Sequence, residues 1–212
     1  MRVAILGTGD VGRSLAKGFA GRGDDVMMGS REAGRAQAAA RAAGATVRGG
    51  TFSEAASWGE LGVLATSWSG TENALRLATP TTLAGKVVID ATNPLVSAPG
   101  KPPALALGHT DSGGEQVQRW LPDARVVKAF NIVGHAHMVR PEFPGGPPDM
   151  FYCGNDGSAK STVAAILDDF GWSSIDIGDI EGARLLEPMC LLWVLYALRG
   201  GGWNHAFKLL KK

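Results

Sequence analysis

The sequence predicts an α/β fold built on a doubly wound, mostly parallel sheet with a small C-terminal extension. Three observations carry this prediction. Short apolar runs alternate with longer helical patterns, which is typical of βαβ crossovers. A glycine-rich segment joins the first apolar run to the first helical pattern. The length of 212 residues, with 45% hydrophobic residues, suits one large domain or one domain with a small appendage.

The apolar runs define the predicted strands, in chain order. They cover residues 2–6, 25–28, 45–47, 62–66, 87–90, 125–130, 150–153 and 174–177. Helical patterns occupy most of the intervening segments, beginning with residues 12–20. The longest pattern, at residues 183–199, has little polar face and predicts a buried or interface helix. Pro188 lies inside it, which predicts a first-turn position or a kink, and the glycines at 200–202 predict a stop before a short terminal helix.

The glycine-rich segment after the first strand is the strongest local signal. Gly7 permits a tight turn, Gly9 lets the backbone approach a pyrophosphate, and Gly12 lets helix and strand pack closely. Free N–H groups at the start of the helix then meet the anion. The segment predicts a Rossmann-type dinucleotide site, and the alternative is a glycine-rich turn that binds no ligand. The residues assigned to this site are Gly7, Thr8, Gly9, Asp10, Val11 and Gly12.

The end of the second strand indicates which dinucleotide is bound. Sites for NAD place an acidic residue there, which holds the ribose 2′-hydroxyl. This sequence has Ser30 and Arg31 instead, and Arg35 follows one helical turn later. A hydroxyl and a guanidinium suit a 2′-phosphate, because arginine makes charge-assisted hydrogen bonds to it. The prediction is NADP(H); the alternatives are a helix start at Ser30 with exposed arginines, or a contact from Glu32 to a hydroxyl in a shifted register.

Two long segments rich in glycine and proline interrupt the alternation. They cover residues 93–114 and 132–149, and both follow predicted strands. Ligands of open α/β sheets gather outside the carboxyl ends of the strands, so we expect these loops on the substrate side. His135 and His137 flank Ala136 in the second loop and would point in opposite directions on an extended strand.

A dehydrogenase of a carbonyl or imine would need a proton donor beside the nicotinamide. Lys128, His135 and His137 are the candidates. The alternative for each histidine is a polar loop residue bonded to backbone or water. For Lys128 it is a strand residue whose ammonium group reaches solvent. A further question concerns four aromatic residues that either stack on a flat ring or pack in the core or a dimer contact: Trp193, Tyr196, Trp203 and Phe207.

Composition and targeting signals argue against several classes of protein. Lys plus Arg number 21 and Asp plus Glu number 20, so no broad positive field favours nucleic acid. Cys153 and Cys190 are far apart and belong to no CxxC motif, which predicts a reduced interior and no metal site. The first apolar run meets Gly7 too early for a signal peptide, and no run reaches the roughly 20 residues of a membrane span. We therefore expect a cytoplasmic protein with no membrane partner.

The opening segment MRVAILGTGDVGRSLAKGFAGRGDDVMMGSRE resembles NADPH-dependent reductases of the deazaflavin coenzyme F420. The resemblance continues, in the family's order, through residues 64–68, 87–93, 126–131, 151–156 and 183–187. The same pattern resembles the cytoplasmic reductase domains of membrane ferric reductases, which pass electrons through a flavin. Two segments, residues 98–114 and 131–138, depart from the family's pattern.

The resemblance implies a fold, a reaction and a set of site residues. It implies an NADP-binding Rossmann domain at residues 1–148 and a small α/β extension at 149–212, which completes the substrate side and contributes to a homodimer. It implies direct hydride transfer between NADP(H) and a ring cofactor such as F420, FMN or FAD. By resemblance, Ser30, Arg31 and Arg35 hold the 2′-phosphate and Thr8 and Gly9 the pyrophosphate. The residues that border the nicotinamide are Thr66, Ser67, Trp68, Asn93 and Pro94.

Two other functions stay open at this point. Hydride transfer between two rings depends on positioning more than on a general acid, which agrees with the lack of an evident catalytic triad. An NADP-dependent dehydrogenase of a small carbonyl or imine would instead use one of the proton donors above. A non-catalytic redox sensor would bind NADP(H) and report its state to a protein partner, because fold alone does not settle function.

Overall fold

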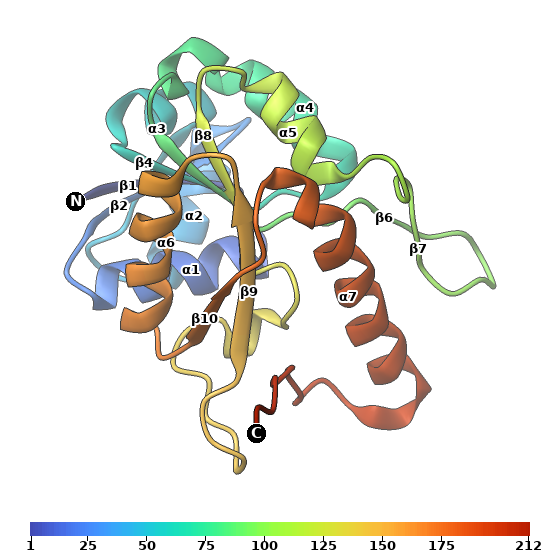
Figure 1. Cartoon of the computed structure of the whole chain (residues 1–212). Coiled ribbons are helices and arrows are strands. Elements are labelled where there is room, and N and C mark those ends of the chain that lie inside the picture. The colour runs from blue at the N-terminus through green and yellow to red at the C-terminus, as the bar shows by residue number, and fades with distance from the viewer.

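The centre of the molecule is an eight-stranded sheet, seen in a computed structural model that describes residues 1–212 (Figure 1). The strand order is β10-β9-β8-β5-β4-β1-β2-β3. All neighbours are parallel except β8 and β9. This arrangement confirms the predicted doubly wound, mostly parallel sheet. The strands are β1 (Arg2–Leu6), β2 (Asp25–Ser30), β3 (Arg48–Thr51), β4 (Leu61–Leu64), β5 (Val87–Asp90), β8 (Arg125–Lys128), β9 (Asp149–Gly154) and β10 (Ser173–Asp176).

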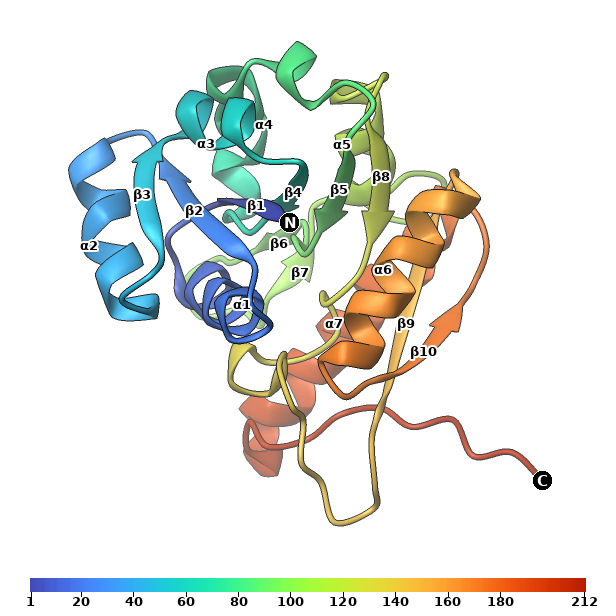
Figure 2. The same cartoon turned by 90° about the vertical axis from the view of Figure 1, so that its left-hand side faces the viewer.

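Helices cover both faces of the sheet (Figures 1 and 2). On one face lie α1 (Asp10–Gly21), α2 (Ala33–Ala43) and α6 (Gly157–Asp169), and on the other lie α3 (Phe52–Trp58), α4 (Trp68–Ala78) and α5 (Gly113–Trp120). Strand residues alternate between the two cores: Val3 and Ile5 pack on the first face, and Ala4 and Leu6 on the second. The long helix α7 (Ala183–Tyr196) follows β10 and packs Leu186 into the first core.

The remaining elements are short. A two-stranded hairpin, β6 (Leu95–Val96) and β7 (Ala104–Leu105), lies within the first of the two loops expected on the substrate side. Three short 3-10 helices cover Pro80–Leu83, His135–His137 and Ile180–Gly182. An irregular turn at Ala197–Gly201 ends α7.

Most predicted strands lie where the apolar runs placed them, but the third does not. Residues 45–47 were the expected strand, whereas β3 covers Arg48–Thr51. The reason is the close approach of α2: a Cβ atom on Gly49 would lie 2.3 Å from the backbone nitrogen of Gln37. The strand beside this helix must therefore be glycine-rich, which no search for apolar residues detects.

Residues 149–212 extend the same sheet. β9 pairs with β8, and α6 and β10 follow it, so the segment placed in the predicted extension shares the first core. The expected terminal helix is absent, because the last residues are held extended by other bonds. Trp193 Nε1 donates to the carbonyl of His205 at 2.8 Å, and the Asp149 N–H donates to the carbonyl of Phe207 at 2.9 Å. Pro188 lies within α7 rather than in its first turn.

Candidate dinucleotide-binding site

The glycine turn after β1 has the geometry that the sequence predicted. Gly7 has φ +137°, and a Cβ atom there would lie 2.1 Å from the carbonyl oxygen of Ala65, so only glycine fits. A Cβ atom on Gly12 would lie 2.5 Å from the carbonyl oxygen of Gly7, which shows how closely α1 packs. At Gly9 a Cβ atom would meet nothing within 4 Å. The turn is therefore closely packed at Gly7 and Gly12 and open to solvent at Gly9, as a bound pyrophosphate requires.

The start of α1 is available to an anion. Its N-cap, Gly9, has no side chain to accept from the first turn, so those backbone N–H groups have no capping partner. Aligned N–H groups and the helix dipole favour a negative group at this position. The acidic residue in the first turn, Asp10, points its carboxylate to Arg13 and is exposed.

The turn opens into a cavity of about 470 Å³ at the carboxyl ends of β1, β2 and β4. This volume lies in the range of small-molecule and cofactor sites. Eight of the predicted site residues line it, and a serine, a glycine and an asparagine on α4 that were not predicted line it as well. The predicted ones are Gly7, Thr8, Gly9, Ser30, Arg31, Arg35, Thr66 and Ser67, and the unpredicted ones are Ser69, Gly70 and Asn73.

The residues on α4 could have been found from spacing. Ser67, Gly70 and Asn73 recur every three positions, which places them on one face of a helix that starts at the carboxyl edge. The N-cap of α4, Ser67, makes no side-chain capping bond, so this helix also presents an open N-terminus to the cavity. The sequence pattern predicts such an open helix start only for α1.

The end of the cavity after β2 carries two arginines. Arg31 and Arg35 are exposed and line the cavity, and neither forms an ion pair. Ser30 is buried, and its hydroxyl is used within the turn: it donates to the carbonyl of Glu32 at 2.8 Å and accepts from the N–H of Glu32 at 3.1 Å. Ser30 therefore shapes the turn that presents Arg31. Two free guanidinium groups at this part of the cavity have the chemistry to bind a phosphate group.

Of the residues predicted to border the nicotinamide, Thr66 and Ser67 line the cavity, whereas Trp68, Asn93 and Pro94 do not. Thr66 Oγ1 bonds to Thr71 Oγ1 at 2.9 Å. The ring of Trp68 stacks on Trp120, with centroids 5.6 Å apart. Asn93 Nδ2 donates to the carbonyl of Asn131 at 2.9 Å. Six predicted site residues do not line the cavity: Asp10, Val11, Gly12, Trp68, Asn93 and Pro94. For all of the predicted site residues, contact with a cofactor stays a prediction.

The ammonium group of Lys128 does not reach solvent, so the alternative to a proton-donor role that the sequence offers for this residue is wrong. Its side chain is fully buried, with Nζ 2.9 Å from Asp90 Oδ2 and 2.8 Å from Glu187 Oε1. Burial alone would lower the pKa of Lys128, but the carboxylates of Asp90 and Glu187 outweigh it and raise the pKa above its usual value. A proton donor at neutral pH needs the opposite shift, so this ammonium group is suited to holding carboxylates rather than to releasing a proton.

The two histidines of the second loop lie in a helical turn rather than on an extended strand. The turn His135–His137 starts after Gly134. His135 Nδ1 lies 3.3 Å from Ser14 Oγ, and His137 Nε2 lies 3.1 Å from Asn204 Oδ1. Neither histidine lines the cavity.

The aromatic residues of the C-terminal region mainly contact one another. Trp193 is buried, and its ring stacks on His205 at a centroid distance of 4.5 Å. Tyr196 meets the same histidine edge-on, and Trp203 lies 5.4 Å from Trp193. Tyr196 and Trp203 remain about half exposed. This arrangement is a small packed cluster at the end of α7.

The cysteines and other ligand types add no further centre. Cys153 and Cys190 are free thiols, and burial raises the pKa of each to about 12. No group of three or more His, Cys, Asp or Glu side chains is placed to hold a metal ion. None of the helices combines the length and the apolar character needed to cross a membrane.

Comparison with known proteins agrees with this site. Residues 2–94 match the family described as NADP oxidoreductase, coenzyme F420-dependent. Over 206 residues the chain is 32% identical to the F420-dependent NADP reductase of Methanocaldococcus jannaschii, covering 92% of this chain and 91% of that protein. The chain belongs to the F420-dependent NADP oxidoreductase family. It is therefore an oxidoreductase of an NADP(H)-binding family, which confirms the resemblance seen in the sequence.

Other relatives show how widely this family's fold is used. The rat metalloreductase STEAP3 is 31% identical over 191 residues, which are 90% of this chain but 36% of that protein. A crystal structure of a candidate F420-dependent NADP reductase from Arthrobacter sp. FB24 is 38% identical, with a TM-score of 0.90 over 99% of both chains. A reductive aminase from Aspergillus terreus, at 22% identity and a TM-score of 0.66 over 94% of this chain and 63% of that one, shares the fold alone.

Proposed function

We propose that this protein transfers a hydride between NADP(H) and a ring cofactor, the deazaflavin F420 or a flavin. The observation that carries the proposal is the cavity beside the glycine turn, where two unpaired arginines lie at the ribose end. Relatives named F420-dependent NADP reductases align along nearly the whole chain, which supports the same acceptor here.

The geometry supports an assignment of the residues that would hold NADP(H). Gly7 and Gly9 and the start of α1 would hold the pyrophosphate, and Arg31 and Arg35 the 2′-phosphate. The carboxyl ends of β4 and β5 would border the nicotinamide, which supplies the hydride. The high pKa of Lys128 agrees with a reaction between two rings, since such a transfer depends on positioning rather than on a side-chain acid.

A second groove supports the proposal that the C-terminal extension completes the substrate side. It has a volume of about 760 Å³ and lies between residues 105–109 and the first turns of α7. The Ala106 N–H donates to the carbonyl of Pro94 at 2.7 Å, so the groove adjoins the turn after β5. Its lining mixes apolar and polar side chains, among them Leu105, Leu107, His109, Arg184, Leu185 and Pro188. A flat ring with polar substituents fits such a surface.

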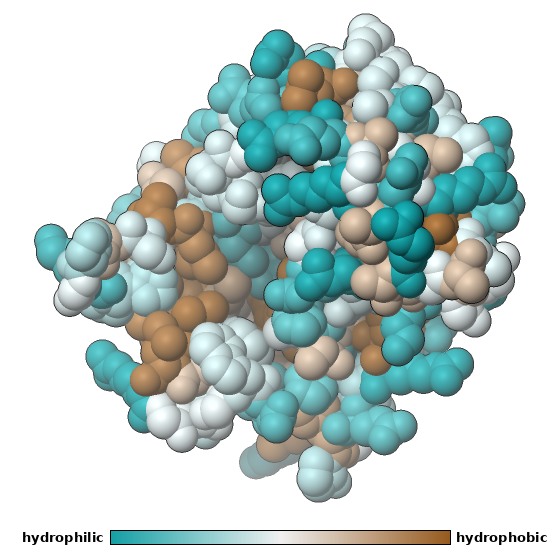
Figure 3. Space-filling view, turned by 180° about the vertical axis from the view of Figure 1, so that it is seen from behind, coloured by the Kyte–Doolittle hydropathy of each residue, from teal (hydrophilic) through white to brown (hydrophobic).

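The homodimer is proposed on the apolar surface of α7. Leu185, Leu192 and Tyr196 are each more than half exposed on this helix, and Leu198 and Trp203 follow it. Figure 3 shows apolar surface gathered on the side where α7 and the hairpin lie. Exposed apolar patches of this kind mark interaction surfaces, and most soluble oligomers are symmetric dimers. Light scattering should give twice the monomer mass, and Leu192→Glu should reduce it to the monomer.

The experiment that tests the proposed function follows NADPH oxidation at 340 nm. Purified protein would be offered F420, FMN, FAD, ferric chelates, small carbonyl compounds and imines, with NADH as the control donor. Turnover with F420 or a flavin supports the proposal. Turnover with carbonyls or imines alone would replace it with a dehydrogenase function. Tight NADPH binding without turnover on any acceptor would favour a redox sensor.

A further inference from the structure

Three buried charged side chains form a cluster below the carboxyl edge of the sheet. They are Lys128 on β8, Asp90 at the end of β5 and Glu187 in α7, and we call them the charge cluster. None is more than 1% exposed. One cation faces two carboxylates, so the cluster needs other hydrogen-bond donors to be stable in the interior.

Those donors come from segments around the predicted nicotinamide side. The Thr92 N–H and hydroxyl donate to Asp90 Oδ1 at 2.9 and 2.7 Å. The Gly113 and Gly114 N–H groups donate to the two oxygens of Glu187, each at 2.9 Å. Because these glycines open α5, the Glu187 carboxylate also meets the positive end of a helix. The cluster thus joins β5, β8, α5 and α7.

Direct contacts lead from the charge cluster to three of the residues predicted to border the nicotinamide. Asn93 follows Thr92 in the chain. Trp68 and Pro94 pack on Gly113, since a Cβ atom there would lie 3.1 Å from the Trp68 ring and 3.3 Å from Pro94 Cδ. A shift of Glu187 or Asp90 would therefore displace these side chains, whereas none of the hydrogen bonds and ion pairs of the cluster involves Arg31 or Arg35.

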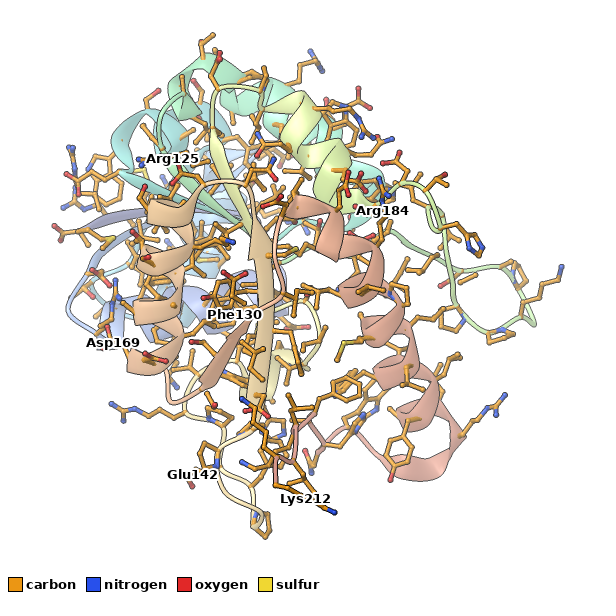
Figure 4. The ribbon with its side chains drawn as sticks, viewed as in Figure 1. Arg125, Phe130, Glu142, Asp169, Arg184 and Lys212 are labelled. Carbon is orange, nitrogen blue, oxygen red and sulfur yellow. The ribbon has the colours of Figure 1, made fainter.

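Two energetically unfavourable features lie in the turn that follows β8. Phe130 is fully buried and has φ +65°, a conformation that side chains with a Cβ atom rarely adopt (Figure 4). Asn131, next in the chain, donates through Nδ2 to Asn93 Oδ1 at 3.0 Å and to the carbonyl of Leu186 at 3.1 Å. Its own Oδ1 is buried and accepts no hydrogen bond. Strain and unpaired polar atoms persist where function requires a particular geometry.

We propose that the charge cluster is a positioning element, which fixes the nicotinamide-side residues Trp68, Asn93 and Pro94 against α7. This inference rests on the proposed function, because it assumes that NADP(H) occupies the cavity. It assigns no proton transfer to Lys128. It separates the site into an adenosine end, which the cluster does not touch, and a nicotinamide end, which it holds in place.

The test compares two ligands that share the adenosine end. Adenosine 2′,5′-bisphosphate lacks the nicotinamide, whereas NADPH carries it and fluoresces when bound. In Glu187→Gln we expect the affinity for the bisphosphate to stay within about twofold, while NADPH binds about fivefold more weakly, the equivalent of one hydrogen bond. The emission of bound NADPH should also move toward that of free NADPH. The ion pair of Arg184 with Glu115 still joins α5 and α7 in this variant.

Thr92→Val is the milder variant, because it removes one hydrogen bond to Asp90 and keeps the side-chain shape. Like Glu187→Gln, it should lower the affinity for NADPH and leave that for the bisphosphate unchanged. If Glu187→Gln does not fold, the result with Thr92→Val decides the test. Asp24→Asn, at the opposite edge of the sheet, is the control for lost stability and should change neither affinity. Parallel weakening of both ligands, or no change in either, would overturn the positioning role. Failure of the wild-type protein to bind NADPH would instead overturn the proposed function.

Discussion

Polar groups are used differently at the amino ends of the strands, here called the amino edge of the sheet, and at their carboxyl ends, the carboxyl edge. At the amino edge, charged side chains bind one another: Arg22 Nε lies 2.6 Å from Asp24 Oδ2, and the chain's N-terminal ammonium lies 2.9 Å from Asp24 Oδ1. At the carboxyl edge, α1 and α4 begin without side-chain caps, and Arg31 and Arg35 form no ion pair. The charged groups around Asp24, which stabilise the fold, and the groups left free for a ligand are thus at opposite edges. Substitutions at the two edges should therefore change different properties.

The largest effect is expected from Gly7→Ala at the carboxyl edge. The new Cβ atom would lie 2.1 Å from the Ala65 carbonyl oxygen, in a backbone conformation with φ +137°. We expect a loss of at least about 3 kcal/mol in the free energy of unfolding, because the turn must move. Urea denaturation would measure it, and NADPH titration should show no binding.

Gly9→Ala is the matched control, two residues away. Its φ of −74° suits alanine, and the Cβ atom would meet no protein atom within 4 Å. Stability should stay unchanged while NADPH affinity falls about tenfold or more, because the methyl group occupies the space of the pyrophosphate. Normal NADPH affinity in this variant would show that the open space above Gly9 is not the binding site.

The second largest effect is expected from Arg31→Ala, which should change the affinity for NADPH without changing stability. Arg31→Ala should weaken NADPH binding by about 1.5 to 3 kcal/mol, or roughly ten- to a hundredfold, and should hardly affect NADH. The melting temperature should not change, since Arg31 is exposed and makes no ion pair. Arg41→Ala, which changes an exposed arginine in the last turn of the following helix α2, is the control and should alter the affinity for neither ligand. Equal weakening of NADPH and NADH by Arg31→Ala would contradict the assignment of the 2′-phosphate.

The positions of the residues assigned to the adenosine end could be predicted from sequence, because the turns that carry them are defined by local sequence. Gly7, Gly9 and Gly12 lie within one turn, and Arg31 directly follows a strand whose apolar pattern is clear. Local spacing fixes where such residues lie once the strand and helix are recognised. The same holds for β1 and β5, whose bounds match the predicted ones.

The charge cluster could not be predicted in this way. Lys128, Asp90 and Glu187 come from three distant segments: the pairing of β5 with β8 brings Lys128 beside Asp90, and the packing of α7 adds Glu187. An isolated lysine in a strand more often reaches solvent, so the sequence favours the wrong environment. The third strand was misplaced for a related reason, since the close approach of α2, and not apolarity, decides its composition.

At the amino edge, Asp24→Asn tests stability and its dependence on pH. Burial would raise the pKa of Asp24, but the hydrogen bonds and charges of Arg22 and the N-terminus outweigh it, so the pKa lies below the ordinary 3.8. A lowered pKa in the folded state stabilises the protein above the unfolded value, and this stabilisation is lost as the pH falls through the folded value. We expect a loss of about 2 kcal/mol at pH 7 that shrinks below about pH 4.

Denaturation of both proteins across this pH range would check the expectation, with NADPH affinity at pH 7 as the second measurement. A difference that stays constant down to the lowest pH at which the wild type is folded would contradict the role of the carboxylate. A change in NADPH affinity would contradict the separation of the two edges.

The smallest effect concerns two helix starts at the carboxyl edge. Thr51 Oγ1 accepts from the Glu54 N–H at 3.2 Å, and Glu54 Oε2 accepts from the Thr51 N–H at 2.6 Å, so α3 is closed by its own side chains. Thr51→Ala should cost about 1 kcal/mol of stability and leave NADPH affinity unchanged. Ser67→Ala, at the uncapped start of α4, should cost little stability and weaken NADPH binding, because Ser67 lines the cavity. If both variants lost stability and neither lost affinity for NADPH, an open helix start would not mark the binding region at this edge.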